Sequence, residues 1–451
     1  MKNRRFLQIL RVIGLIVIVG MIPVVSVAGV EITVYNDSSS LFIVDNTITA
    51  LAFDDSGYAW IGFNSGFFNT NLVKFAGESS YFLYGDSLNP GLNASWVTSI
   101  DFTENFDVWI GTQTQGARRF DRDSTWWEYR PDNSDLADLS VYTVAIGTDD
   151  HIWFGFYEAG LSQLTPDSVW STYQSPSYPM DNSIRDVFVD SDGDIWTAAI
   201  GGLYRYDGTA VWTSYVVANS DLPSDTVYSV NQDWSGDYWI GTHNGVCRFD
   251  GGSNWTCFTS ENSDLAPGPV TSLAIDSNGY VWCGHREIQE ERDSVWVSRY
   301  DGISWIKINI DNNELVRNIS VTCLAADAGG DIWVGTSGEG ISQIRMTTPV
   351  HDDDHGTLPN DHVLSQNHPN PFNSSTKISY RIPKRSDVTL QVYDILGRKV
   401  TTLVNEIQSA GTYSAVWDGL GATGQRVASG IYLYRLSANG FTQTRKMILL
   451  K

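Results

Sequence analysis

The stretch Asp233-Trp234-Ser235-Gly236-Asp237-Tyr238-Trp239-Ile240-Gly241 decides the fold of this chain, because its pattern recurs along most of the sequence. The pattern Asp-x-x-Gly-x-x-Trp-x-Gly begins again at Asp54, Asp276 and Asp327, and at Asp190 with Ala198 in place of the last Gly. Two degraded copies complete the series. The seven tryptophans of these units lie about 45 residues apart, at positions 60, 109, 153, 196, 239, 282 and 333. A fixed period of this length is the mark of a repeat architecture.

The hydrophobic pattern within a unit predicts four short strands. The first is apolar and β-branched, as at 227–232, and the second carries the tryptophan. The third ends in Arg-Tyr-Asp-Gly, as at Arg205–Gly208, and the fourth follows as Trp-x-x-Tyr, as at Trp212–Tyr215. An Asp-Gly pair between strands is a strong hairpin signal. Because four strands at this period are typical of a propeller blade, we expect an all-β chain with a seven-bladed β-propeller at residues 29–348.

The two ends of the repeat region are predicted to close the ring together. The seventh unit has three strands, at 321–327, 331–336 and 341–345, and lacks a fourth. Near the N-terminus, Ile32–Tyr35 imitates a fourth strand and is followed by a polar turn. A strand from this segment would complete the last blade and remove the exposed sheet edges.

The composition fits a globular protein with two differently charged parts. The chain has 17 Trp, 21 Tyr and 18 Phe with only 18% charged residues, which excludes a disordered chain. Its formal net charge of −23 disfavours nucleic acids and anionic membranes as partners. Residues 29–362 carry 14 basic and 48 acidic side chains, whereas residues 363–451 carry 11 and 4. This split indicates two domains with different partners.

Residues 1–28 have the features of a secretory signal peptide. Basic residues open the chain, an apolar run follows at 12–19, and Ser26-Val27-Ala28 places small residues at a cleavage site. A retained membrane anchor is the alternative. No later segment approaches the length of apolar residues that a membrane span needs, so we expect no integral membrane segment in the mature chain. The expected location is outside the cell or on the outer cell surface.

The repeated units resemble the two-component regulator propeller repeat over residues 31–348. That family builds the periplasmic sensor regions of bacterial hybrid sensor kinases, where the propellers face oligosaccharide ligands. The resemblance implies a ligand-binding ring, with carbohydrate as the expected ligand class. The sequence continues into a different module in place of a kinase, so only binding carries over.

A polar linker at 349–366 precedes that module, which spans residues 367–451. Alternating runs such as Val388–Asp394 and Ala428–Leu436 predict about seven strands in a small β-sandwich. From Asn367 to Lys451 the module closely resembles the type A C-terminal sorting domain of the type IX secretion system. Similar immunoglobulin-like folds occur in flagellar hook-capping proteins. The resemblance implies Sec export followed by passage across the outer membrane, with the secretion machinery as a partner; an adhesive sandwich without a sorting role is the alternative.

Loop lengths indicate which face of the ring binds a ligand. From the tryptophan of the second strand to the end of the third, most units take 10 or 11 residues, whereas the first takes 15 and the sixth takes 18. Both insertions, at 64–72 and 285–294, fall in the same loop of the unit and are predicted to flank Glu339. The predicted binding residues on this face are Trp96, Tyr142, Arg185, Tyr228, His243, His285, Arg286, Glu287 and Glu339.

Most of the 17 tryptophans are expected to pack blade against blade. Five are assigned to fourth strands: Trp127, Trp170, Trp212, Trp255 and Trp305. Four stay outside the repeating positions: Trp96, Trp126, Trp234 and Trp296. Of these, Trp96 opens the second unit on the predicted ligand face and could stack on a sugar ring, although a surface-packed tryptophan fits it better.

Two other functions compete with binding. His243, His285 and Glu287 lie on adjacent predicted loops and could act as acid and base, as in the streptogramin lyases, to which the chain has a weak resemblance. A charged, solvated loop explains the same residues. No Gly-x-Ser-x-Gly, His-Glu-x-x-His or phosphate-loop motif is present. A structural surface protein without a small ligand is the third hypothesis.

No cofactor is expected. Asp190, Asp192 and Asp194 resemble part of a calcium loop, but its further ligands are missing, which favours an ordinary hairpin. The linker segment His351–His355 could hold a metal, although a flexible acidic linker fits it better.

The four cysteines allow a disulfide in an exported protein. Cys247 and Cys257 straddle one predicted hairpin and could pair. Cys283 and Cys323 belong to adjacent units. Buried free thiols are equally consistent with the sequence.

Overall fold

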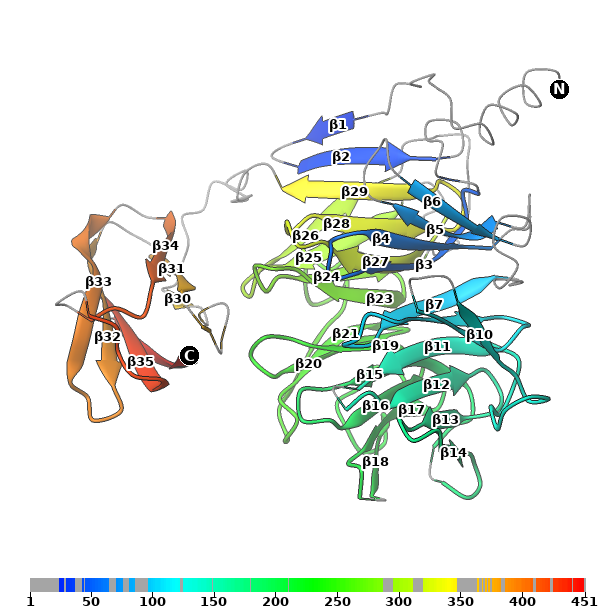
Figure 1. The fold of residues 1–451 in the computed structure, drawn as a ribbon. Coiled ribbons are helices and arrows are strands. Elements are labelled where there is room, and N and C mark those ends of the chain that lie inside the picture. The colour runs from blue at the N-terminus through cyan, green and yellow to red at the C-terminus, as the bar shows by residue number, and fades with distance from the viewer. Residues whose placement is uncertain are drawn as a thin grey trace.

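The computed structural model describes residues 24–346 and 363–449, except for internal stretches at 28–29, 37–42, 44, 65–69, 76–80, 86–95, 122–124, 148, 179, 210, 287–294, 311–318, 365–366, 368–369, 371, 374, 383–385, 409–410, 422–424 and 440. Every named element in these ranges is a β-strand. The described residues contain no helix that is long and apolar enough to cross a membrane. The strands form a seven-bladed propeller and a C-terminal sandwich (Figure 1). The predicted fold class is therefore confirmed.

Each blade is one antiparallel sheet whose strands follow chain order from the centre of the ring outward. Blade one holds β3 (Ile48–Phe53), β4 (Ala59–Phe63), β5 (Thr70–Phe75) and β6 (Tyr81–Gly85), and blade two holds β7 (Val97–Phe102), β8 (Val108–Thr112), β9 (Ala117–Phe120) and β10 (Trp126–Tyr129). Blade three holds β11 (Val141–Ile146), β12 (Ile152–Phe156), β13 (Leu161–Leu164) and β14 (Trp170–Tyr173), and blade four holds β15 (Ile184–Val189), β16 (Ile195–Ala199), β17 (Gly202–Tyr206) and β18 (Trp212–Tyr215). Blade five holds β19 (Val227–Gln232), β20 (Tyr238–Thr242), β21 (Gly245–Phe249) and β22 (Trp255–Phe258), and blade six holds β23 (Val270–Ile275), β24 (Val281–His285), β25 (Trp296–Tyr300) and β26 (Trp305–Asn309). Blade seven begins with β27 (Val321–Ala326), β28 (Ile332–Thr336) and β29 (Ile341–Met346).

The N-terminal segment completes blade seven, as the sequence predicts. β2 (Val30–Tyr35) pairs antiparallel with β29, from Val30 opposite Met346 to Tyr35 opposite Ile341. A fifth strand, β1 (Val24–Val27), pairs with β2. β1 falls inside the segment expected to be a signal peptide, whose removal stays a prediction. β2 thus supplies the fourth strand that the seventh unit lacks, and β1 adds a further strand outside it.

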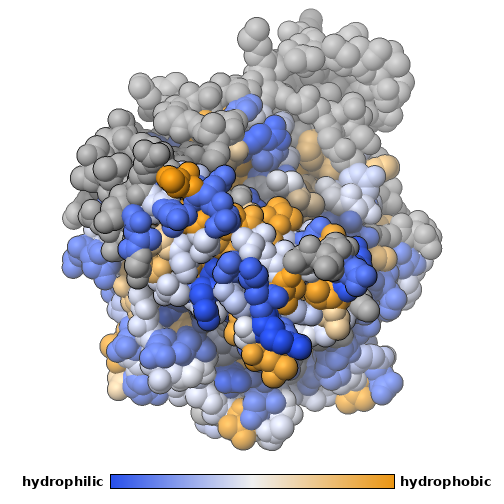
Figure 2. Space-filling view, turned by 90° about the vertical axis from the view of Figure 1, so that its left-hand side faces the viewer, coloured by the Kyte–Doolittle hydropathy of each residue, from blue (hydrophilic) through white to orange (hydrophobic). Residues whose placement is uncertain are grey.

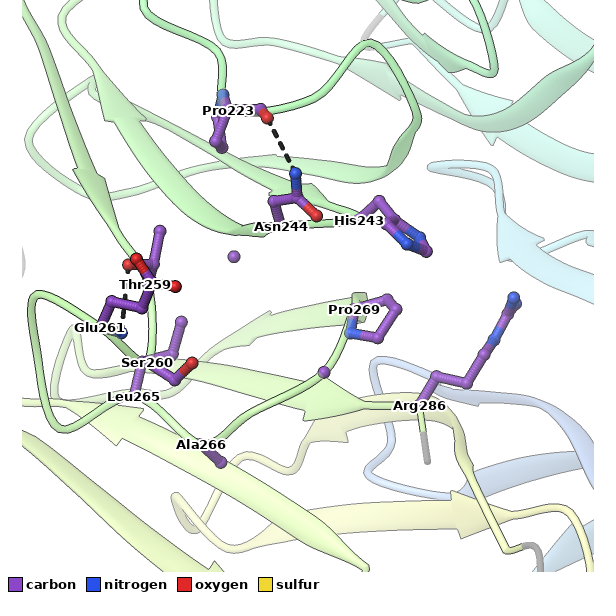
Figure 3. A pocket seen from close by; sticks show the side chains of 12 residues that line it. Pro223, His243, Asn244, Thr259, Ser260, Glu261, Leu265, Ala266, Pro269 and Arg286 are labelled. Atoms are coloured by element: carbon purple, nitrogen blue, oxygen red, sulfur yellow. Dashed lines mark hydrogen bonds between the residues drawn. The ribbon is translucent and has the colours of Figure 1, made fainter. Parts of the chain in front are cut away.

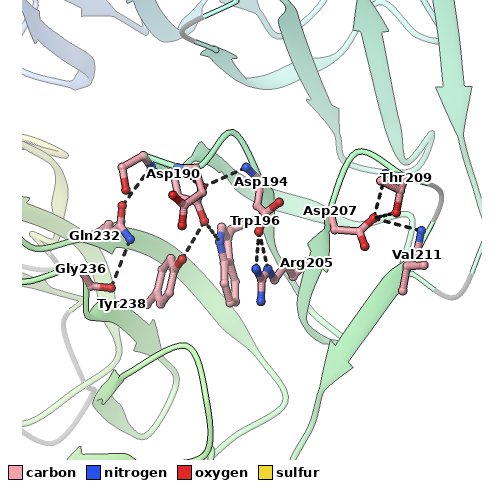
Figure 4. A network of polar contacts seen from close by, with 12 residues as sticks. Asp190, Asp194, Trp196, Arg205, Asp207, Thr209, Val211, Gln232, Gly236 and Tyr238 are labelled. Carbon is pink, nitrogen blue, oxygen red and sulfur yellow. Dashed lines mark hydrogen bonds and ion pairs between the residues drawn. The ribbon is translucent and has the colours of Figure 1, made fainter.

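The aspartate of the repeat explains why the motif recurs. In blade four, Oδ1 of Asp190 accepts hydrogen bonds from the backbone amides of Asp192 and Asp194, each at 2.9 Å, and so closes the turn between the first two strands. Its Oδ2 accepts the indole N–H of Trp196 at 2.8 Å (Figure 4). The same indole bond, at 2.9–3.0 Å, joins Asp54 to Trp60, Asp233 to Trp239, Asp276 to Trp282 and Asp327 to Trp333. Because a buried indole N–H needs an acceptor, one carboxylate fixes both the turn and the packed tryptophan.

The tryptophans of the second strands fill the layers between blades. Trp60 is fully buried in one cluster with Val97 and Ile110 of the next blade, and Trp282 lies in one cluster with Val334 of blade seven. This packing confirms the predicted role of the repeated tryptophans.

One tryptophan assignment is wrong. Trp126, and not Trp127, occupies the recurring place on the fourth strand: it pairs with Phe120 and stacks on that ring at 4.5 Å. Trp127 is 38% exposed, and the Arg119 guanidinium lies 4.9 Å from its ring centroid. Successive side chains of a strand point to opposite faces, so Trp126 and Tyr129, three positions apart, pack on opposite sides of the blade. Trp126 lies against the cluster of Trp60 and Phe120, and Tyr129 lies against the cluster of Trp109 and Phe154. The complete Trp-x-x-Tyr pattern therefore starts at Trp126.

The C-terminal domain is a two-sheet sandwich. One sheet holds β30 (Val363–Leu364), β31 (Thr376–Ile382) and β34 (Gly411–Trp417). The other holds β33 (Lys399–Gln408), β32 (Ser386–Asp394), β35 (Gly430–Ala438) and β36 (Phe441–Leu449). Trp417, Tyr434 and Phe372 are buried between them. Figure 2 views the molecule from the side where the sandwich lies and shows hydrophobic residues exposed between hydrophilic ones; in the sandwich these include Ile395, Leu396, Ile407, Val416 and Ile431.

Two of the four cysteines are bonded. Cys247 on β21 and Cys257 on β22 lie directly opposite each other and form a disulfide. Cys283 and Cys323 are free thiols, and Cys283 is buried. The sequence is consistent with either this disulfide or free thiols at both positions, and the structure contains the disulfide.

Candidate functional site

The blade topology sorts the loops onto two faces of the ring. Successive strands are antiparallel, so the loops between second and third strands share a face with the connections from blade to blade. The Asp-x-x-Gly turns lie on the opposite face. We call the first of these the loop face. Of the predicted binding residues, all except Glu287 are described, and each lies at a strand end or loop of this face.

A β-bulge recurs at the second residue of every inner strand, where the strand meets the loop face. Each bulge skips one residue in the pairing with the second strand, and the skipped residues are Thr49, Thr98, Tyr142, Arg185, Tyr228, Thr271 and Thr322. We call them the bulge ring. A bulge re-aims the side chain that it leaves unpaired. Three consecutive blades therefore present Tyr142, Arg185 and Tyr228 where the other four present threonine.

Two of the four threonines of the bulge ring join neighbouring blades. Oγ1 of Thr98 donates a hydrogen bond to the carbonyl of Val141 at 2.6 Å, and Oγ1 of Thr271 donates to the carbonyl of Val321 at 3.1 Å. The larger tyrosine and arginine side chains contact side chains of neighbouring blades instead: Arg185 lies over Tyr142, and Tyr228 lies under Arg286. The bulge ring thus carries threonine in blades six, seven, one and two, and a tyrosine or arginine that can contact a ligand in blades three, four and five.

Arg185 lies between two tyrosines. Its Cζ is 5.4 Å from the ring centroid of Tyr142 and 4.9 Å from that of Tyr157, the first residue after β12. Nη1 donates a 3.4 Å hydrogen bond to the Tyr142 hydroxyl. Both tyrosines are exposed, at 37% and 43%. Nε of Arg185 is buried and has no hydrogen-bond partner among the described residues.

A second cluster of the same kind joins blades five and six. The Arg286 guanidinium lies 5.0 Å from the ring centroid of Tyr228, whose hydroxyl is 3.3 Å from Nδ1 of His243. Figure 3 shows His243 and Arg286 projecting on the same side of the opening that they border. The structure therefore brings together five predicted residues as two clusters of tyrosine with arginine: Tyr142, Arg185, Tyr228, His243 and Arg286.

A pocket of about 620 Å³ opens beside the second cluster. His243 and Arg286 line it together with the chain at Pro223, Thr259–Glu261 and Leu265–Pro269 (Figure 3). Nδ2 of Asn244 donates to the carbonyl of Pro223 at 3.1 Å and fixes one wall. A smaller pocket of about 420 Å³ lies between blades three and four, lined by Ser175, Tyr178, Met180, Asp181, Asn182 and Tyr204. Pockets of this size suit a small ligand.

His285 is not part of the open face. Its side chain is buried, with Nε2 2.9 Å from Oγ of Ser298, and burial lowers the pKa of His285 to about 4. It stays neutral at physiological pH and does not line the pocket. Glu287 lies outside the described residues. The described part of the chain thus does not assemble the acid–base trio that the lyase hypothesis needs with His243.

The remaining predicted residues lie elsewhere on the loop face. Trp96 is 42% exposed before β7 of blade two. Glu339 is half-buried in the loop of blade seven, where its backbone N–H donates a hydrogen bond to Oγ1 of Thr336. The strand bounds confirm that blades one and six have the longest loops between second and third strands, at 64–69 and 286–295. Blade six packs on one side of blade seven, and blade one packs on the other side. Most of both loops lies outside the described residues.

Sequence reasoning missed Tyr157 and the pocket walls. Tyr157 could have been noticed as an aromatic residue directly after the second strand of its blade, where polar residues follow in blades two, five and seven. The pocket walls carry no sequence signal, because they come from loops of two blades.

Two of the three aspartates of the calcium hypothesis are engaged by protein groups. Asp190 also accepts the Tyr238 hydroxyl at 2.7 Å, and Asp194 is ion-paired with Arg205 (Figure 4). Among the described residues, no cluster of three His, Cys, Asp or Glu side chains is arranged to hold a metal. The linker segment His351–His355 lies outside the described residues.

Comparisons with known proteins agree with this two-domain architecture. Residues 315–338 match the two component regulator propeller family, and residues 367–440 match the FlgD Ig-like domain. No curated protein matches the chain. The propeller is thus similar to two-component regulator propellers.

Solved structures share the fold at low sequence identity. The chain aligns with the extracellular domain of a hybrid two component system from B. thetaiotaomicron at 15% identity and a TM-score of 0.56, covering 92% of this chain and 56% of that one. It aligns with PorZ, a surface component of the type-IX secretion system of Porphyromonas gingivalis, at 15% identity and a TM-score of 0.53, covering 90% and 60%. A streptogramin B lyase matches at 13% identity and a TM-score of 0.55, covering 71% and 100%. The chain spans little more than half of the first two proteins, and these likenesses concern the fold alone.

Proposed function

We propose that this protein is an exported, non-enzymatic binding protein whose propeller captures an oligosaccharide on its loop face. The observation that carries the proposal is the pair of tyrosine–arginine clusters beside a pocket of about 620 Å³. Tyrosine rings offer flat apolar surfaces to the C–H faces of a sugar, and arginine, histidine and asparagine bond its hydroxyls. The lyase alternative is less well supported, because His285 is buried and bonded to Ser298 and does not line the pocket with His243.

The test is a glycan array probed with the purified protein and with Tyr228→Ala. We expect binding of one or a few related glycans, with affinity reduced by about tenfold or more in the variant, since a central aromatic contact often dominates an interface. Trp127→Ala is the matched control, because it removes an exposed aromatic ring from an outer strand far along its blade from the bulge ring. Absence of binding to every glycan, with both proteins folded, would refute the proposal.

The C-terminal sandwich is proposed to carry the export signal. Its resemblance to type IX sorting domains, its match to an Ig-like domain and its basic charge in an otherwise acidic chain support this role. Removing residues 363–451 should leave a folded propeller in the periplasm of the native host. Fractionation checks the outcome, and normal surface delivery of the truncated chain would contradict it.

A further inference from the structure

Two arginines of the loop face stand apart from the other arginines of the propeller. Six described arginines pair with a carboxylate: Arg118, Arg119, Arg130, Arg205, Arg248 and Arg345. Arg299 is buried against the rings of Tyr280 and Trp282. Arg185 and Arg286 have no carboxylate partner among the described residues, although acidic side chains far outnumber basic ones in this domain.

Stacking holds both guanidinium groups in place without neutralising their charge. Arg185 is held between Tyr142 and Tyr157, and Arg286 lies over Tyr228. A guanidinium stacked on an aromatic ring keeps its planar fork of N–H donors, which suits a carboxylate or sulfate. The buried Nε of Arg185 has no acceptor in the described part of the protein.

We propose that the oligosaccharide of the loop face is acidic, and that Arg185 and Arg286 bind its carboxylate or sulfate groups. The inference rests on the proposed carbohydrate function and narrows it. His243 and Arg286 lie on one side of the pocket and Glu261 lies on the opposite side (Figure 3), so we expect an acidic group of the ligand to lie beside His243 and Arg286. The tyrosines then stack on sugar rings at both clusters.

The experiment compares matched charged and neutral probes with the full chain by titration calorimetry. One pair is an oligogalacturonate and its methyl ester; the other is a chondroitin sulfate oligosaccharide and its desulfated form. We expect at least one acidic member to bind about tenfold or more tightly than its neutral partner, the effect of a charge-assisted hydrogen bond. The pair that responds distinguishes carboxylate from sulfate.

Arg185→Gln and Arg286→Gln should each remove most of this preference. The glutamine amide still donates to a sugar hydroxyl but carries no charge, so affinity for the acidic probe should fall more than affinity for the neutral probe. Lys307→Gln is the control, because it removes one positive charge from an exposed outer-strand position. Thermal melting of each variant verifies folding. Equal binding of charged and neutral probes, or a preference that both arginine variants keep, overturns the inference while the carbohydrate function stands. Failure of the protein to bind any glycan on the array refutes the proposed function itself.

Discussion

Asp276 shows how one side chain can decide the stability of a blade. It is buried and accepts the amides of Asn278 and Tyr280 and the indole N–H of Trp282, at 2.8, 3.1 and 2.9 Å. Asp276→Ala leaves three donors without this acceptor and should cost about 3 kcal/mol of unfolding free energy. Asp276→Asn keeps one acceptor oxygen and should cost roughly half as much. Chemical denaturation measures both, and an alanine variant as stable as the parent would refute this account of the motif.

Asp186 gives the propeller a pH dependence. Its Oδ2 accepts the Val230 amide at 3.0 Å, and burial raises its pKa to about 7 from the usual 3.8 of an aspartate. Between these values the folded protein holds a proton that the unfolded chain has lost, so the stability contributed by this group falls as pH rises from about 4 to 7. Above pH 7 the penalty of burying the charge is complete.

Asp186→Asn should therefore stabilise the propeller more at pH 8 than at pH 5. An asparagine imitates the protonated carboxyl and keeps an oxygen for the Val230 amide, so the difference should be on the order of 1–2 kcal/mol. Melting curves at the two pH values measure it, with Asp135→Asn on an exposed turn as the control. An equal effect of Asp186→Asn at both values would contradict the prediction.

How far the sequence predicts this site depends on the residue. Tyr142, Arg185 and Tyr228 could be placed on the loop face, because the repeat fixes their position in the inner strand. The burial of His285 could not be foreseen, since it depends on Ser298 of the neighbouring strand. The bulge that re-aims the ring residues is likewise invisible to a pattern of apolar and polar residues. Repetition therefore predicts backbone positions well and side-chain surroundings poorly.

At the scale of elements, β2 holds the two ends of the propeller together. It gives blade seven its outer strand, and Ile32 and Val34 are buried in the cluster that also contains Trp282 of blade six. Deleting residues 29–41 together with the preceding segment should lower the melting temperature of the whole propeller, because an open ring loses packing on two blades. A chain that begins at residue 29 and keeps β2 is the control. An unchanged melting temperature in the deletion would show that β2 does not latch the ring.

Among the described residues, no hydrophobic cluster combines side chains of the propeller with side chains of the sandwich. The sandwich cluster around Trp417 draws only on residues from 364 onward, and the described clusters of the propeller draw only on residues up to 344. Each domain thus has the interior that independent folding requires. Their opposite charge balance is consistent with the separate tasks proposed for them, which are ligand binding for the acidic ring and export for the basic sandwich.

Calorimetry of the full chain should therefore show two unfolding transitions. A chain that ends at residue 348 should keep only the transition of the propeller, at nearly the same temperature. A saturating glycan ligand should raise that transition and leave the transition of the sandwich unchanged, because a ligand stabilises only the unit whose folded state it binds. The shift should be smaller for Arg185→Gln than for the Lys307→Gln control at the same concentration of an acidic ligand. A single transition that moves as a whole with ligand would instead show that the two cores unfold as one unit.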